Sequence, residues 1–274
     1  MAIPPVLLKE DELLQDETTS SAYETARDIS KYLLMHYGSI EDAFERPHHP
    51  LAPSHGLPRR LSEVLELVAL RTGTSVSSVL DVGCSVGGIS HALSTWVKDV
   101  VVGIDSSVRS IEVAQSLTRH GGGTFSVAQL GPFFREVQVT LPAAERRARV
   151  EFEVDDACAL AAPHRPFDAV ILSNVLDRVK DPELCLKQFT DSARILRRGG
   201  LLMVACPWSW YPEFSSPETW FGSSSNGTTS EQVLKNILSA DLDLMLEKDE
   251  AGVLRQNPRE YDYFEAHVTV WRKR

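Results

Sequence analysis

A short turn of small residues holds the part of this chain best suited to bind a ligand. It follows the apolar segment 78–82 and precedes a helical pattern over 89–97, so that backbone N–H groups can approach a ligand closely. A second apolar segment, 100–104, ends at Asp105. An acidic residue about 20 residues beyond such a turn commonly accepts hydrogen bonds from ribose hydroxyls. We therefore expect a nucleoside ligand here.

Asp81 distinguishes between two kinds of nucleoside ligand. A dinucleotide site requires G-x-G-x-x-G, so that a helix N-terminus faces a pyrophosphate, and a carboxylate beside the turn would repel that group. The same carboxylate suits an ammonium or a sulfonium. The order Asp81-x-Gly83-x-Ser85-x-Gly87 resembles the first motif, D-x-G-x-G-x-G, of the S-adenosylmethionine (SAM) methyltransferases, with a serine at the middle glycine. The alternative is an unrelated α/β turn that contains glycines.

Polar residues at the ends of later strands complete the expected site. The alternating segment 150–154 ends at Asp155-Asp156-Ala157, where we expect Asp156 to accept the adenine amino group. The apolar segment 167–172 ends at Ser173, and ligands of open parallel sheets lie beyond the carboxyl ends of the strands. The residues expected at SAM, and later at its product S-adenosyl-L-homocysteine, are Asp81, Gly83, Cys84, Ser85, Gly87, Asp105, Ser106, Asp156, Ala157 and Ser173.

Composition excludes several other functions. The chain has 274 residues and a formal net charge of −10, which disfavours nucleic acid as a partner because phosphate contacts dominate that affinity. The four cysteines form no C-x-x-C pair and the histidines at 48, 49 and 55 lack regularly spaced partner ligands, so we expect no metal site. No signal peptide or membrane-spanning run is found, and we expect a cytoplasmic protein without membrane contacts.

The elements around the turn predict an α/β Rossmann-like fold, a seven-stranded, mostly parallel sheet with helices on both faces. Residues 1–20 are expected to form a flexible tail and 21–274 one methyltransferase domain with a helical N-terminal segment over 21–72. Residues 124–149 predict a hairpin or an irregular insertion. Three of the five tryptophans fall within 208–220, and the segment 207–228 is expected to form a lid or substrate wall.

A narrower resemblance extends over nearly the whole chain. The segments that carry it are Tyr23–Thr25, Tyr32–Gly38, Asp156–Leu160, Ser173–Val179 and His267–Arg272. Together they resemble the methyltransferase of ovothiol biosynthesis, known as the C-terminal domain of 5-thiohistidine (sulfoxide) synthases. The resemblance implies transfer of a methyl group from SAM to an imidazole nitrogen of 5-thiohistidine. It also implies a separate synthase as a partner, because no such domain is attached. The insertion 124–149 departs from the family pattern.

In this reading the segment after residue 173 acts on the acceptor. We expect Asp177 to fix the imidazole tautomer and take the released proton, Asn174 to orient the ring, and Arg178 to bind the substrate carboxylate or a thiolate. His267 is expected to face the same pocket. Residues expected to contact the substrate are Tyr23, Tyr37, Trp208 and Trp210.

Other interpretations of these residues, of the acceptor and of the function stay open. Asp177 and Arg178 also fit a helix-start carboxylate with a solvated ion pair, and His267 also fits ordinary packing. The acceptor can be another small molecule or a protein histidine. A protein that keeps this fold as a non-catalytic scaffold is the alternative outside enzymes.

Overall fold

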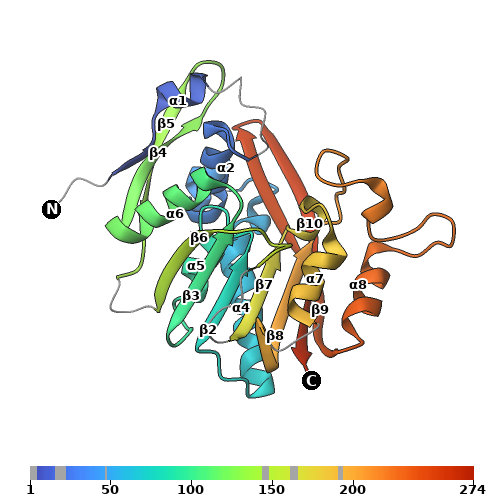
Figure 1. Ribbon diagram of the computed structural model, residues 1–274. Coiled ribbons are helices and arrows are strands. Elements are labelled where there is room, and N and C mark those ends of the chain that lie inside the picture. Colours follow the sequence, from blue (N-terminus) through green and yellow to red (C-terminus); the bar gives the residue numbers. More distant parts are fainter. Residues whose placement is uncertain (1–4, 16–22, 47, 144–147, 161–165, 191–193) are drawn as a thin grey trace.

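A seven-stranded sheet with the order β6-β3-β2-β7-β8-β10-β9 runs through the computed structural model, which describes residues 5–15, 23–46, 48–143, 148–160, 166–190 and 194–274 (Figure 1). The strands are β2 (Ser78–Val82), β3 (Val100–Asp105), β6 (Arg149–Val154), β7 (Phe167–Ser173), β8 (Leu196–Cys206), β9 (Leu242–Asn257) and β10 (Glu260–Lys273). The first five are parallel, and β10 is antiparallel to both of its neighbours. The predicted fold class is confirmed.

Both faces of the sheet are covered because the side chains of its central strands are apolar on both sides. On β7, Ala169 and Ile171 pack into one core and Val170 and Leu172 into the other, as the two-residue period of a strand requires. The first core includes α4 (Leu57–Thr72) and α5 (Gly88–Leu93), and the second includes α7 (Pro182–Thr190) and α8 (Ser230–Leu238). The remaining helix of the repeating unit, α6 (Val108–His120), lies between β3 and β4 in the chain.

A smaller sheet stands beside the main one (Figure 1). The insertion forms an antiparallel hairpin of β4 (Gly122–Ala128) and β5 (Phe134–Thr140), and β1 (Val6–Leu8) pairs with β4 in parallel. The N-terminal segment therefore differs from the flexible tail expected over 1–20. β1 and α1 (Glu10–Gln15) dock there because Leu8 and Leu13 bury their side chains in the core of this sheet. Residues 16–20 lie outside the described part of the chain.

The helical N-terminal segment lies against the long β9–β10 hairpin. It consists of α2 (Ala26–Tyr37), α3 (Ile40–Phe44), the 3₁₀ turn η1 (Ala52–Ser54) and α4. α2 begins at Ala26 because the Thr25 side chain caps the helix by accepting from the Asp28 N–H. Arg60 of α4 pairs with Glu250 of β9 at 2.8 Å, and Arg255 of β9 pairs with Glu45 after α3 at 2.8 Å.

No helix in the described part of the chain combines the length and apolar character needed to cross a membrane. Within the same residues, no three His, Cys, Asp or Glu side chains gather in a group that could hold a metal ion.

Candidate active site

The turn after β2 is fixed to the end of β3 by backbone and carboxylate hydrogen bonds. The N–H groups of Gly83 and Cys84 both donate to the carbonyl of Ile104, at 2.8 and 2.9 Å. The carboxylate of Asp105 accepts from the Ser85 N–H at 2.8 Å and from the Ser107 N–H at 2.9 Å. Asp105 therefore positions the turn, and burial raises its pKa.

Two glycines of this turn are required by packing as well as by backbone conformation. Gly83 and Gly87 have φ of 71° and 86°, where side chains are disfavoured. A Cβ at Gly83 would lie 2.4 Å from the Cγ2 of Val175, and one at Gly87 would lie 2.4 Å from the ring of Phe152. The sequence predicted these glycines as room for a ligand; the structure shows that protein atoms also need that room.

We expect Gly87→Ala to destabilise the protein markedly more than Gly73→Ala. Gly73 has φ of 64° but nothing within 4 Å of the added Cβ, so its substitution introduces backbone strain alone. The substitution at Gly87 also crowds the ring of Phe152. Such overpacking typically lowers the free energy of unfolding by a further amount of roughly 1–3 kcal/mol. Urea unfolding measures both variants. Equal losses of stability would contradict the packing role.

Helix α2 closes over the turn through two side chains. The Nδ1 of His36 accepts from the Gly88 N–H at 3.0 Å, and the Tyr37 hydroxyl donates to the Val86 carbonyl at 2.7 Å. Burial lowers the pKa of His36 to about 4, so the ring is a neutral acceptor at ordinary pH. Tyr37, expected at the substrate, thus holds the turn in place.

Asp81 offers one free carboxylate oxygen inside the molecule. Its side chain is fully buried, and Oδ2 accepts from the Ser90 hydroxyl at 2.6 Å. Oδ1 has no hydrogen-bond partner among the described residues. Burial raises the pKa of Asp81 from 3.8 to about 7. A cationic ligand beside Oδ1 would satisfy this oxygen and favour the ionised carboxylate.

The ligand-free protein should lose the stabilising contribution of Asp81 as the pH rises from about 4 to about 7. In that window the native carboxyl stays protonated, whereas the unfolded one ionises near 3.8, so the native state binds more protons. Asp81→Asn does not titrate and its amide oxygen can still accept from Ser90. Thermal melts should show wild type losing several degrees relative to this variant across the window. Melting curves that stay parallel with pH would contradict the assignment.

A second group of residues lies at the end of β7. The 3₁₀ turn η3 (Leu176–Arg178) places Asp177 in a fully buried position. Its Oδ2 accepts from the Ser209 N–H at 3.0 Å and the Ser209 hydroxyl at 3.1 Å, and it pairs with Arg178 at 3.0 Å. Its Oδ1 has no partner in the described structure. One oxygen is thus fixed and the other is left for a ligand.

Arg178 joins the N-terminal segment to the lid. Its Nε donates to the Tyr23 hydroxyl at 2.8 Å, and its Nη2 donates to the Ser209 hydroxyl at 2.9 Å. The guanidinium lies 4.7 Å from the ring centre of Tyr211, a cation–π contact, and Tyr23 stacks on Phe214 at 5.6 Å. These contacts favour a role in closing the site over the one expected from sequence, binding the substrate carboxylate or a thiolate.

Buried polar atoms without partners lie just beyond the carboxyl ends of β7 and β8, and on the β10 residue that pairs with the last residue of β8. Besides Oδ1 of Asp177, they are Oδ1 of Asn174, Nε1 of Trp208 and Nδ1 of His267, each unpaired among the described residues. Asn174 and Trp208 have φ of 57° and 56°, a conformation that non-glycine residues adopt at a cost and that clusters at functional sites. The Trp208 and His267 rings lie 6.2 Å apart. Such atoms are costly to bury unless a ligand pairs with them.

The remaining residues that the sequence predicted at the site differ in burial and in hydrogen-bond partners. Trp210 donates to the Ser230 hydroxyl at 3.1 Å and stacks on Trp220, so it belongs to the interior of the lid. Asp156 is exposed, and its carboxylate accepts from the Cys158 N–H at 2.8 Å. The others range from buried Cys84 through half-buried Ala157 and Ser173 to exposed Ser106.

Sequence reasoning missed Ser209, which bonds both Asp177 and Arg178, and Phe214, which stacks on Tyr23. Both lie in the expected lid, but only the folded lid brings them against η3. The clustering of aromatic residues in the lid segment was a signal in the sequence. It did not indicate which of those residues face the site.

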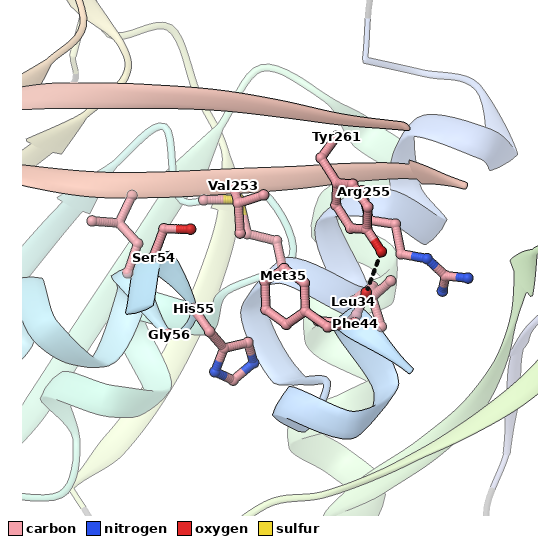
Figure 2. Close-up of a pocket in the computed structure, with 11 residues that line it drawn as sticks. Leu34, Met35, Phe44, Ser54, His55, Gly56, Val253, Arg255 and Tyr261 are labelled. Atoms are coloured by element: carbon pink, nitrogen blue, oxygen red, sulfur yellow. Dashed lines mark hydrogen bonds between the residues drawn. The ribbon is translucent and has the colours of Figure 1, made fainter. Parts of the chain in front are cut away.

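A separate small pocket lies at the junction of α2, α3 and the β9–β10 hairpin (Figure 2). Figure 2 shows Tyr261 above Phe44, with rings stacked at 5.6 Å, and Met35 and Val253 on the pocket wall. Its lining includes no residue of the glycine turn or of η3. The pocket is therefore distinct from the site at the strand ends.

Comparison of the chain with known proteins identifies a family that it matches. The family described as Methyltransferase domain matches residues 54–223. Two relatives named ubiquinone biosynthesis O-methyltransferase, from Parvibaculum lavamentivorans and Xylella fastidiosa, are 27% and 29% identical over 58% and 68% of this chain. The chain spans 53% and 63% of their lengths. The crystal structure of the [4+2]-cyclase SpnF is 16% identical, covers 99% of both chains and has a TM-score of 0.52, which is a likeness of fold.

Proposed function

This chain belongs to the methyltransferase domain family and is a SAM-dependent methyltransferase, and we propose that its acceptor is an imidazole nitrogen of 5-thiohistidine. The residues present fit SAM. The unpaired Oδ1 of Asp81 can accept from the ammonium of the methionine moiety, and Asp105 lies at the end of β3, where the ribose hydroxyls are expected. Asp156 and Ala157 would lie at the adenine.

When bound, SAM supplies a methyl carbon activated by its sulfonium. The task of the protein is then to hold a nucleophile in line with that carbon in a site that excludes water. Arg178, Tyr23 and the lid aromatics close the site through the contacts described above. Asp177 and Asn174 lie at the end of β7, on the side of the site where the acceptor must enter.

The unpaired Oδ1 of Asp177 is the observation that carries the proposal. A neutral imidazole has one N–H and one nitrogen with a free lone pair. The Asp177 Oδ1 accepts from the N–H, which leaves the other nitrogen free to react, and the same oxygen takes the proton once the ring has been methylated. Asn174 Oδ1 and Trp208 Nε1 supply one further acceptor and one donor for the polar substituents of the substrate.

A phenolic hydroxyl is the second candidate acceptor. The relatives from Parvibaculum lavamentivorans and Xylella fastidiosa are named as O-methyltransferases of ubiquinone biosynthesis. A phenol would donate its proton to the same Oδ1 of Asp177. A phenol with one hydroxyl would leave Asn174 Oδ1 without a donor, whereas the second hydroxyl of a dihydroxylated phenol or the ammonium of 5-thiohistidine could supply one.

An acceptor panel tests the proposal. The protein is incubated with SAM and, separately, with 5-thiohistidine, histidine, a histidine-containing peptide and a dihydroxylated phenol, and the products are identified by mass spectrometry. We expect methylation of 5-thiohistidine at a rate well above the other acceptors. Methylation of the phenol, with 5-thiohistidine unchanged, would establish the second candidate and reject the first.

A further inference from the structure

Two of the four cysteines lie together where the loop after β6 meets α7. The Sγ of Cys158 donates to the Asp181 carbonyl at 3.4 Å, and the N–H of Cys185 donates to the same oxygen at 3.0 Å. The Cys158 side chain packs against the buried cluster that includes Cys185. The side-chain amide of Gln188 also donates to the Cys158 carbonyl, at 3.2 Å. The loop is thus held on the first turn of α7, with the Cys158 sulfur beside the carbonyl oxygen to which Cys185 also bonds.

The two thiols differ in the way that a reactive and a resolving cysteine differ. Cys158 is partly exposed, whereas Cys84, Cys185 and Cys206 are buried. The neighbouring Cys185 thiol lowers the pKa of Cys158, and the neighbouring Cys158 thiol, together with burial, raises the pKa of Cys185. A thiol with a lowered pKa and solvent access is the one that reacts with a small disulfide.

We propose that Cys158 and Cys185 are a disulfide-forming site that small-molecule disulfides oxidise. The Cys158 thiolate attacks one sulfur of the small disulfide, forms a mixed disulfide and releases the first thiolate. Cys185 then loses its proton and attacks the Cys158 sulfur, which forms the Cys158–Cys185 bond and releases the second thiolate. The protein loses two electrons and two protons, and the small disulfide gains the electrons and becomes two thiols.

The bond alters the turn that is expected at the adenine. In the disulfide the Cys158 sulfur carries no hydrogen, so it can no longer donate to the Asp181 carbonyl, and it lies about 2.0 Å from the Cys185 sulfur. The Cys158 N–H is bonded to Asp156 at 2.8 Å, and its movement displaces that carboxylate. This consequence rests on the proposed SAM site: the oxidised protein should bind SAM several-fold more weakly, and a thiol reductant should restore the affinity.

Glutathione disulfide is the probe for the site. It is added to the folded chain of 274 residues, and the products are followed by mass spectrometry of proteolytic peptides. Wild type should lose two hydrogen atoms and yield a Cys158–Cys185 cross-linked peptide. Cys185→Ser should stop at a glutathione adduct on Cys158, and Cys158→Ser should give neither product. Cys84 and Cys206 serve as internal controls, because burial raises the pKa of both and they should stay unmodified.

The possible results test the disulfide site and its effect on SAM binding separately. A stable glutathione adduct in wild type, a cross-link to another cysteine, or reaction of Cys185 in Cys158→Ser would overturn the disulfide site. A Cys158–Cys185 bond with unchanged SAM affinity by calorimetry would overturn the coupling to the adenine turn. Absence of SAM binding by the reduced protein would count against the proposed function, and the cross-link would still decide the disulfide site.

Discussion

Asp177→Asn should lower the turnover of 5-thiohistidine by roughly 10²–10⁴-fold, the usual contribution of a positioned proton acceptor. The amide keeps the shape of the carboxylate and one oxygen for Ser209, but it cannot take a proton. If the NH₂ group of the amide takes the position of Oδ1, a donor faces the imidazole N–H, and no hydrogen bond can form between them. Because Asp177 lies at the end of β7 and makes no bond to the glycine turn in the described structure, SAM affinity should remain near the wild-type value.

Glu213→Gln is the matched control for Asp177→Asn. It makes the same chemical change on an exposed carboxyl group of the lid, next in the chain to Phe214, which stacks on Tyr23. Single-turnover kinetics with saturating SAM, together with calorimetry for SAM affinity, measures both variants. A control that retains turnover while Asp177→Asn loses it supports the assignment. Wild-type turnover by Asp177→Asn would remove Asp177 from the mechanism.

Asp105→Ala should weaken SAM binding by about 100-fold or more. The wild-type carboxylate is expected to accept from two ribose hydroxyls, and hydrogen bonds to charged groups contribute about 1.5–3 kcal/mol each. It also holds Ser85 and Ser107 by their N–H groups, so its removal loosens the turn that faces SAM. Calorimetric titration with SAM, after a thermal melt has established that the variant folds, gives the affinity.

Asp155→Ala provides the comparison at the neighbouring strand end. Its N–H donates to the Asp105 carbonyl at 3.1 Å, so the two residues lie at the ends of adjacent strands. We expect this variant to bind SAM within a few-fold of wild type. If Asp155→Ala and Asp105→Ala lose affinity equally, the ribose does not depend on Asp105 in particular.

The fold was predictable because its signals are local and repeated. The apolar segments at 78–82, 100–104 and 167–172 are short and bounded by turn residues, and each became a parallel strand. The N-terminal segment was harder, because its docking depends on an edge of the β4–β5 hairpin. Leu8 and Leu13 are too few to predict an element, and only the hairpin provides the surface that buries them.

The position of the candidate residues near the strand ends was predictable from the sequence, whereas their hydrogen-bond partners were not. Position at a strand end singled out Asp81, Asp105 and Asp177, since parallel strands place these ends together. Partners were not predictable, because they come from distant segments. Tyr37 turned out to bond the Val86 carbonyl, and Arg178 turned out to bond Tyr23 across 155 positions of sequence.

The most direct test of the account is to find which atom receives the methyl group. SAM carrying a ¹³C-labelled methyl is turned over with 5-thiohistidine, and NMR correlates the methyl signal with the carbons of the product. The account predicts a methyl group bonded to a ring nitrogen, with the sulfur unmodified. A methyl group on the sulfur, or no transfer to 5-thiohistidine by a protein that binds SAM, would contradict it.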